Sequence, residues 1–155
     1  SFWFTANSRG ETSGGRFFDK CTSTLTNWCY IGGIGNNYFI FTTTFDGGYG
    51  IWQSPSFINF DGVTWYHIVI TYDNSSTSNN PTVYINGGEV TMTQISVPSG
   101  TPVISTDPYV IGNRADTART FDGKIDQFAI WDKILTLSES QAIYNSGNGL
   151  AYTSW

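Results

Sequence analysis

The amino-acid sequence predicts an all-β protein in which two antiparallel sheets pack as a β-sandwich, with one short helix near the C-terminus. Short runs rich in Val, Ile, Thr and aromatic residues recur along the 155 residues, separated by turns rich in Gly, Asn and Asp. No long segment repeats its apolar residues at helical spacing. The run at 65–72, Trp-Tyr-His-Ile-Val-Ile-Thr-Tyr, is apolar on both faces, as expected for a strand in a sandwich interior.

The first half of the chain contains a series of strands, and glycine-rich turns account for most of the breaks between them. Such turns lie at 13–15, between the first two strands, at 32–35 and at 46–48. The strands that we expect in this half are 1–7, 16–20, 28–31, 37–44 and 49–53.

The second half repeats this pattern around a clear hairpin signal. Asn86-Gly87 lies between two β-rich runs, and both residue types tolerate the positive φ angles of a two-residue turn. A polar loop at 73–81 precedes the hairpin. The expected strands are 65–72, 82–85, 89–93, 109–111 and 124–131.

One short helix is predicted after the last strand. Thr136 and Glu139 have the spacing of a capping box, in which each side chain binds the other residue's backbone amide. The apolar residues at 142–144 then pack against the protein, and Gly147 is placed to end the turn in a left-handed conformation.

Length and charge limit the classes of protein that the chain can belong to. A chain of 155 residues is one domain, here 1–155. The net charge is −5, and the seven Lys and Arg residues are scattered, which argues against binding to nucleic acid. No apolar run is long enough to insert into a membrane. Only 12% of residues are charged, so the surface is dominated by neutral hydroxyl and amide groups.

The second half contains several short motifs. They are Trp65-Tyr-His67, Tyr84-Ile-Asn-Gly87, Ile111-Gly-Asn113 and Gly123-Lys-Ile-Asp126, followed by Trp131. In this order and spacing the chain resembles the laminin-G-like, or concanavalin A-like lectin-glucanase, jelly-roll family. The resemblance implies a jelly roll, which is a fold shared by lectins, adhesion modules, glycosidases and spacers.

The start of the chain departs from the resembled pattern. Members of the family usually have one earlier strand beside the last one, whereas this sequence begins at Ser1 within a strand. The earlier strand is therefore absent from this sequence. The chain is then part of a longer protein, or processing removed its start, or another segment fills its place.

The sequence lacks the residue pattern of a hydrolase, and we predict that the protein is not an enzyme. Glycosidases with this fold need two facing carboxylates. The three glutamates, Glu11, Glu89 and Glu139, do not alternate with other acids on a strand. The single histidine, His67, lies on a very apolar strand, where we expect it to be half-buried and structural.

Asp122 and Asp126 are the candidate metal ligands. Strict alternation over 124–131 puts Asp126 on the same face as Phe128 and Ile130, so its carboxylate points inward if that face is the core. A buried carboxylate needs a partner. A structural calcium ion would suit it, with help from Asp122, and related jelly rolls often carry one. The alternative is a hydrogen-bonded Asp126 that holds the first and last strands together.

Two segments carry the residue types of a carbohydrate site. Tyr49 and Trp52 lie among glycines, where aromatic rings can remain exposed to stack on sugars. Asn113, Arg114 and Asp116 lie in a polar loop between strands and can bind hydroxyl groups. The alternatives are that Trp52 packs in the core and that the charged residues form ion pairs at the rim.

The two cysteines, Cys21 and Cys29, flank a short loop that a disulfide could close. A disulfide would indicate an oxidising compartment. Two buried thiols are the alternative.

Together these observations predict a non-catalytic glycan-binding or adhesion module of an extracellular, cell-surface or virion protein. The alternative is a structural or assembly module, for instance of a viral capsid or fibre, that contacts neighbouring protein subunits through a sheet edge.

Overall fold

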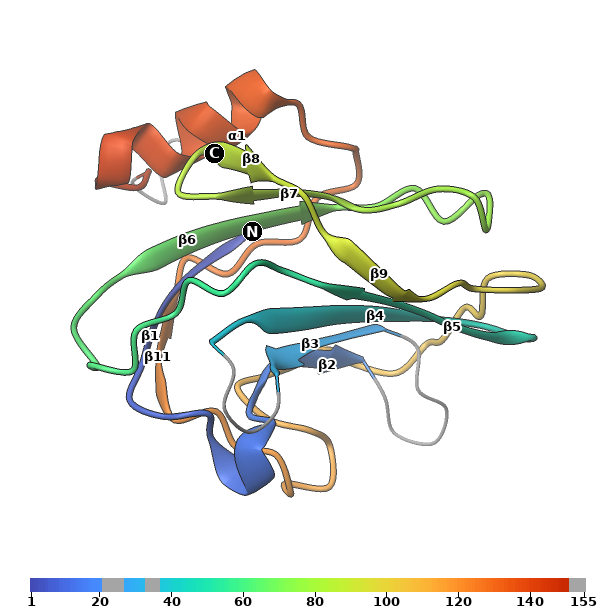
Figure 1. Ribbon diagram of the computed structural model, residues 1–155, viewed down its shortest axis with the longest axis horizontal. Helices are drawn as coiled ribbons and strands as arrows, with labels where there is room; N and C mark the ends of the chain where they lie inside the picture. Colours follow the sequence, from blue (N-terminus) through green and yellow to red (C-terminus); the bar gives the residue numbers. More distant parts are fainter. Residues whose placement is uncertain (21–26, 33–36, 151–155) are drawn as a thin grey trace.

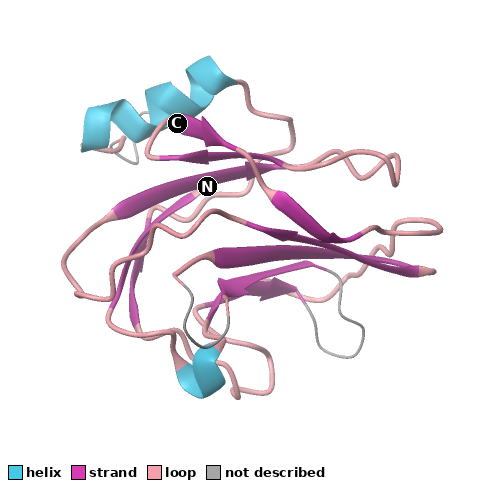
Figure 2. Ribbon diagram, in the orientation of Figure 1, coloured by secondary structure: helices cyan, strands magenta, loops and turns pink. Residues whose placement is uncertain are grey.

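The computed structural model describes residues 1–20, 27–32 and 37–150, and it confirms the β-sandwich (Figures 1 and 2). Two antiparallel sheets lie face to face, and one helix lies across the outer side of the smaller sheet (Figure 1). The elements are, in order, β1 (Phe2–Ala6), η1 (Glu11–Ser13), β2 (Arg16–Lys20), β3 (Asn27–Ile31), β4 (Phe39–Phe45), β5 (Gly48–Gln53), β6 (Tyr66–Thr71), β7 (Thr82–Ile85), β8 (Gly88–Val90), β9 (Thr93–Ser96), β10 (Val110–Ile111), β11 (Gly123–Asp126), α1 (Leu137–Tyr144) and η2 (Asn145–Gly147).

The two sheets have different strand orders. The five-stranded sheet has the order β11-β1-β6-β7-β8, and the six-stranded sheet has the order β10-β2-β3-β4-β5-β9. The strand expected at 89–93 is in fact divided between β8 and β9. These two strands belong to different sheets, so the chain crosses the sandwich between them.

β1 lies inside the five-stranded sheet. It pairs with β11 on one side and with β6 on the other, and β11 is an edge strand of the sheet that the structure describes. The five residues of β1 are all buried. Phe2 and Phe4 face the core, and Trp3 faces outward, where its ring stacks on Tyr144 of α1 at 5.6 Å between centroids.

Aromatic rings from both sheets form the core. Phe4 of β1 and Phe17 of β2 are fully buried, and their ring centroids lie 4.6 Å apart. Phe41 and Trp52 continue this layer with stacked rings, 6.1 Å apart. Full burial of a side chain such as Phe contributes about 1.5–3 kcal/mol, so the burial of these rings stabilises the packing of the two sheets.

The hairpin and the helix form for the local reasons that the sequence indicates. Asn86 and Gly87 connect β7 to β8 with φ angles of 51° and 76°. Thr136 caps α1, since its hydroxyl accepts a bond from the Glu139 amide and the Glu139 carboxylate accepts one from the Thr136 amide. The residue that ends the helix is Asn145, with φ 49°, and not Gly147 as expected, because asparagine also tolerates the left-handed region.

Within the described part of the chain, none of the helices has the length and apolar character needed to span a membrane.

Candidate functional site

The outer face of the six-stranded sheet carries a cluster of aromatic and charged side chains. Along β3, Cys29 and Ile31 point into the core and are fully buried. Alternation therefore places Trp28 and Tyr30 on the outer face. Arg16 pairs with Tyr30 in the strand register, and Asp19 pairs with Trp28, so both lie on the same face.

Rings and a guanidinium group form a continuous row on this face. The ring of Tyr49 meets Trp28 edge-on, with 5.7 Å between centroids. The guanidinium of Arg16 lies over the rings of Trp28, at 5.6 Å, and Tyr30, at 4.6 Å. Tyr49 is 43% exposed whereas Trp28 is 8% exposed, so Tyr49 is the accessible end of the row.

Arg16, at the end of this row, also forms a buried ion pair with Asp19. Residues three apart on a regular strand face opposite sides, but a bulge between Arg16 and Phe18 brings Arg16 and Asp19 to one face. Arg16 Nε lies 3.2 Å from Asp19 Oδ2, and the two side chains are 10% and 0% exposed. Burial raises the pKa of Asp19, and the Arg16 guanidinium opposes that change.

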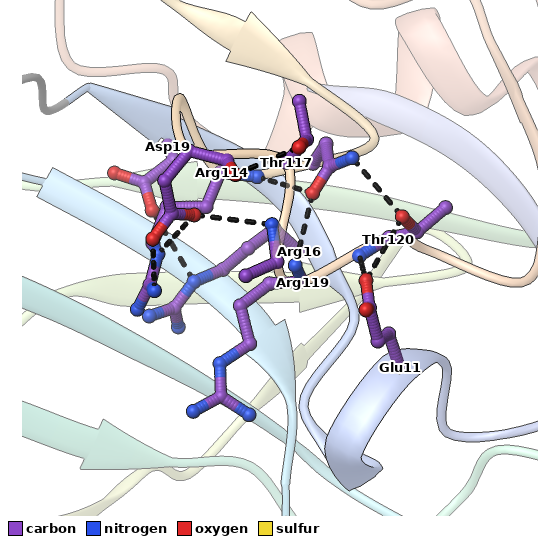
Figure 3. Close-up of polar contacts among 10 residues, drawn as sticks. Glu11, Arg16, Asp19, Arg114, Thr117, Arg119 and Thr120 are labelled. Atoms are coloured by element: carbon purple, nitrogen blue, oxygen red, sulfur yellow. Dashed lines mark hydrogen bonds and ion pairs between the residues drawn. The ribbon is translucent and has the colours of Figure 1, made fainter.

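The polar loop at 113–120 lies next to this ion pair (Figure 3). Asn113 Oδ1 accepts bonds from the amides of Arg114 and Arg119, at 2.8 and 3.0 Å. Arg114 binds both carboxylate oxygens of Asp116, and this contact lowers the pKa of Asp116 to about 2. The charges of Arg114 and Arg119 lower the pKa of Arg16, in addition to the larger effect of its burial.

The structure places four of the five predicted carbohydrate residues near this face, with different roles. Tyr49, Arg114 and Asp116 are accessible, and the last two form the ion pair that we considered as the alternative. The Asn113 side chain holds the loop together through its bonds to backbone amides and to Thr120 Oγ1.

The prediction for Trp52 is wrong. Its side chain is 1% exposed, and its ring packs against Phe41 and Tyr72. The indole Nε1 donates to Asn80 Oδ1 at 2.8 Å. Along β5, Tyr49 faces outward and Trp52 faces inward because they are three residues apart on a regular strand.

Sequence reasoning missed Trp28, Tyr30 and Arg16. The alternation of Trp28 and Tyr30 with the small or apolar residues Cys29 and Ile31 was the available signal. The bulge that aligns Arg16 with Asp19 leaves no such signal in the sequence.

The acidic side chains bear on the prediction that the protein is not an enzyme. All twelve acidic side chains lie in the described residues. Burial raises the pKa of Asp19, but its side chain is fully buried against Arg16. Asp19 is therefore not accessible as a proton donor, and the absence of catalytic activity stays a prediction.

The predicted orientation of Asp126 is also wrong. Asp126 is exposed, whereas Ile125 and Phe128 both pack against the core. The strand ends at Asp126, and Gln127 has a φ angle of 47°, so the alternation on which the prediction rested is broken at this residue.

Asp122 and Asp126 lie at opposite ends of β11, about 13 Å apart at roughly 3.3 Å per residue. Asp122 accepts bonds from Asn7 Nδ2, at 2.9 Å, and Ser8 Oγ, at 2.7 Å, and these bonds lower its pKa. In the residues that the structure describes, no three His, Cys, Asp or Glu side chains gather to hold a metal. The two aspartates therefore do not fit one calcium site, and the calcium ion itself stays a prediction.

His67 is buried more deeply than expected. It is 1% exposed, and its ring lies 4.9 Å from Trp3 and 5.9 Å from Tyr144. Burial lowers its pKa to about 4, so the imidazole is neutral and packs as part of an aromatic stack.

Only one of the two cysteines lies in the described residues. Cys29 is fully buried, and burial raises the pKa of its thiol. Cys21 lies outside the described residues, so the disulfide stays a prediction.

The larger pocket lies between the sheets rather than on the outer face. It has a volume of about 480 Å³ and is lined by inward-facing rings such as Phe18, Phe41 and Phe128, with Tyr72 and Tyr109 toward one end of the sandwich. None of the predicted carbohydrate residues lines it.

The two-layer antiparallel architecture defines the chain as a jelly-roll domain of the concanavalin A-like type. A laminin G family model, described as "Concanavalin A-like lectin/glucanases superfamily", matches residues 1–140, and the chain belongs to this family. No curated protein matches the sequence. Because the family includes both lectins and glucanases, function has to be argued from the site.

Proposed function

We propose that this domain is a non-catalytic glycan-binding module of an extracellular, cell-surface or virion protein. The observation that carries the proposal is the row of planar groups on the outer face of the six-stranded sheet, from Tyr49 through Trp28 to Arg16. Membership of a superfamily that includes lectins supports it.

The accessible groups at the two ends of the row have the chemistry to bind a short oligosaccharide, whereas Trp28 and Arg16 between them are each only 8% exposed. The row extends from β5 to β2, about 14 Å at roughly 4.8 Å between neighbouring strands. The exposed ring of Tyr49 can stack on the C–H face of a sugar. At the other end, Arg114 and Asp116 supply donors and acceptors for hydroxyl groups, and they already hold each other in place.

The test is a glycan array that compares the wild-type domain with Tyr49→Ala. Tyr109→Ala is a matched control, because Tyr109 is 38% exposed, close to the 43% of Tyr49, but lines the pocket between the sheets. We expect Tyr49→Ala to abolish binding and Tyr109→Ala to retain it. A wild-type domain that binds no glycan at millimolar concentration would refute the proposal.

A second candidate function is assembly with neighbouring protein subunits, as in a viral capsid or fibre. β9 is an edge strand of the described six-stranded sheet. Ile95 within β9 and Val97 directly after it are 56% and 68% exposed. An exposed apolar edge invites another chain to add a strand. Sedimentation at two protein concentrations tests this function. A strict monomer would refute it, and an oligomer that Ile95→Lys dissociates would support it.

A further inference from the structure

The pocket between the sheets leaves part of the apolar interior uncovered. Its volume is about 480 Å³, which is within the usual range for sites that bind small molecules. Four of the apolar side chains that line it pack against the core and yet are only partly buried, namely Phe18, Ile70, Tyr72 and Phe128. The pocket lies at the end of the sandwich from which the 73–81 loop projects (Figure 1). These side chains therefore offer an apolar ligand a surface that the facing sheet does not cover.

The aromatic rings of this pocket form two separate groups. In the first group, the ring centroid of Phe128 lies 5.9 Å from that of Phe2 and 5.8 Å from that of Phe18. In the second group, the centroids of Phe41 and Tyr72 lie 6.0 Å apart. Among the described residues no ring of one group contacts a ring of the other, although both groups line the same pocket. The space between the two groups can therefore receive a further ring.

The charged side chains that line the pocket are negative on balance. Asp132 is exposed and has no hydrogen-bond or ion-pair partner in the part of the chain that the structure describes. The Asp73 carboxylate accepts a bond from the Ser75 amide at 2.9 Å, and this bond lowers the pKa of Asp73, so the group is ionised at neutral pH. Lys133 also lines the pocket, but it is paired with Glu139. Two carboxylates are thus left to attract a cation.

Two further nitrogen atoms near the pocket do not reverse this charge. The amine of Ser1 donates to the Ala129 carbonyl at 2.8 Å, and burial lowers its pKa to about 5, so it is neutral at pH 7. The ammonium of Lys20 lies 5.0 Å from the centroid of the Tyr109 ring. Because Tyr109 lines the pocket, this contact shows that a ring there can hold an ammonium group against its face.

We propose that the pocket between the sheets binds an amine with an aromatic body. The body inserts between the two groups of rings, and the ammonium lies beside Asp73 and Asp132. The two carboxylates decide the class of ligand, because they repel an anion and are left unused by a neutral apolar molecule. The proposal does not rest on the glycan-binding function, since none of these residues belongs to the row on the outer face of the six-stranded sheet.

Three probes that share one phenyl group and one chain length test the proposal. They are phenylbutylamine, phenylbutanol and phenylbutyrate, which are positive, neutral and negative at neutral pH. Isothermal titration calorimetry with the 155-residue protein measures the dissociation constant of each probe. We expect the amine to bind about tenfold more tightly than the alcohol, since each exposed carboxylate contributes a few-fold, and the butyrate to bind most weakly.

The indole N–H signals of two tryptophans locate the binding in a nitrogen-15 spectrum. Trp131 lines the pocket, so the amine should shift its signal. Trp28 lies on the outer face of the six-stranded sheet, and its signal should stay in place. A shift of the Trp28 signal alone would place the amine elsewhere and overturn the proposal.

Three variants separate the charge from the apolar walls. Asp132→Asn should weaken the amine about threefold and leave the alcohol unchanged, because it removes one exposed charge and no contact of the fold. Asp122→Asn is the matched control, since it removes the same charge just before β11, away from the pocket, and should change neither affinity. Phe128→Ala removes part of one aromatic wall and should weaken the amine and the alcohol alike. Circular dichroism confirms that each variant is folded.

The results that contradict the proposal concern affinity and charge. It is overturned if none of the three probes binds at millimolar concentration, or if the alcohol or the butyrate binds as tightly as the amine. It is also overturned if Asp132→Asn and Asp122→Asn have equal effects on the amine, because the attraction would then come from the net charge of the protein and not from this pocket.

Discussion

The burial of His67 makes a quantitative prediction about stability and pH. His67 is the only histidine of the chain, and it is packed between Trp3 and Tyr144 with 1% of its surface exposed. Its burial lowers the pKa from 6.5 in the unfolded chain to about 4 in the folded protein. Lowering the pH should therefore destabilise the protein, because protonation of this ring favours the unfolded state.

The sign and size follow from proton linkage. Between pH 6.5 and about 4 the unfolded chain carries a proton on His67 and the folded protein does not. The contribution of His67 to stability is therefore fully present above pH 6.5 and is lost as the pH falls toward the folded-state pKa. Complete loss amounts to roughly 3 kcal/mol, at about 1.4 kcal/mol for each pH unit.

Urea denaturation of the wild type and of His67→Phe, each above pH 6.5 and near pH 4, measures this contribution. The wild type should lose more stability than the variant by an amount of that order. The single histidine also gives a single Hε1 resonance, so its titration in the folded protein can be followed without comparing several histidines. A folded-state titration near 6.5, or parallel losses in the two proteins, would show that the reasoning is wrong.

Further predictions concern packing, charge, capping and metal. Trp52→Ala should lower the free energy of unfolding by about 3–5 kcal/mol, whereas Tyr49→Ala should change it little; equal effects in urea would contradict the assigned faces of β5. Arg16→Met should destabilise by about 3–5 kcal/mol because it leaves Asp19 buried and unpaired, and the double variant with Asp19→Leu should recover most of this loss; a double variant as unstable as the single one would argue against the ion pair. Thr136→Ala should cost about 1 kcal/mol in thermal unfolding and Thr136→Ser much less, unless the cap does not form. A chelator should lower the melting temperature, because the predicted calcium ion would bind only the folded protein, and an unchanged value would contradict the calcium prediction.

Local signals predicted the architecture well. The strand at 65–72 and the Asn86-Gly87 turn are determined locally, since both depend on side-chain pattern and on conformations allowed within a few residues. The capping box of Thr136 is equally local, and the structure has it as expected.

The site was less predictable because it depends on which face of each strand is inside. Nothing near Trp52 in the sequence says that Phe41 and Tyr72, from other strands, pack on it. The error at Asp126 and the omission of Arg16 have a related cause. In each case a local irregularity of the backbone breaks the alternation, so the residues that follow it change faces. The irregularity is the positive φ angle of Gln127 after Asp126 and the bulge of β2 after Arg16.

The position of β1 also has a consequence for the order in which the molecule can form during synthesis. β1 pairs Phe2 with Ile68 of β6 and Phe4 with Ile125 of β11, so both of its neighbours are made much later than β1 itself. Until β6 and β11 have been made, the side chains of Phe2 and Phe4 cannot be buried in a sheet. Because contacts so distant along the chain form slowly, nascent chains halted before β11 should need chaperones to stay in solution.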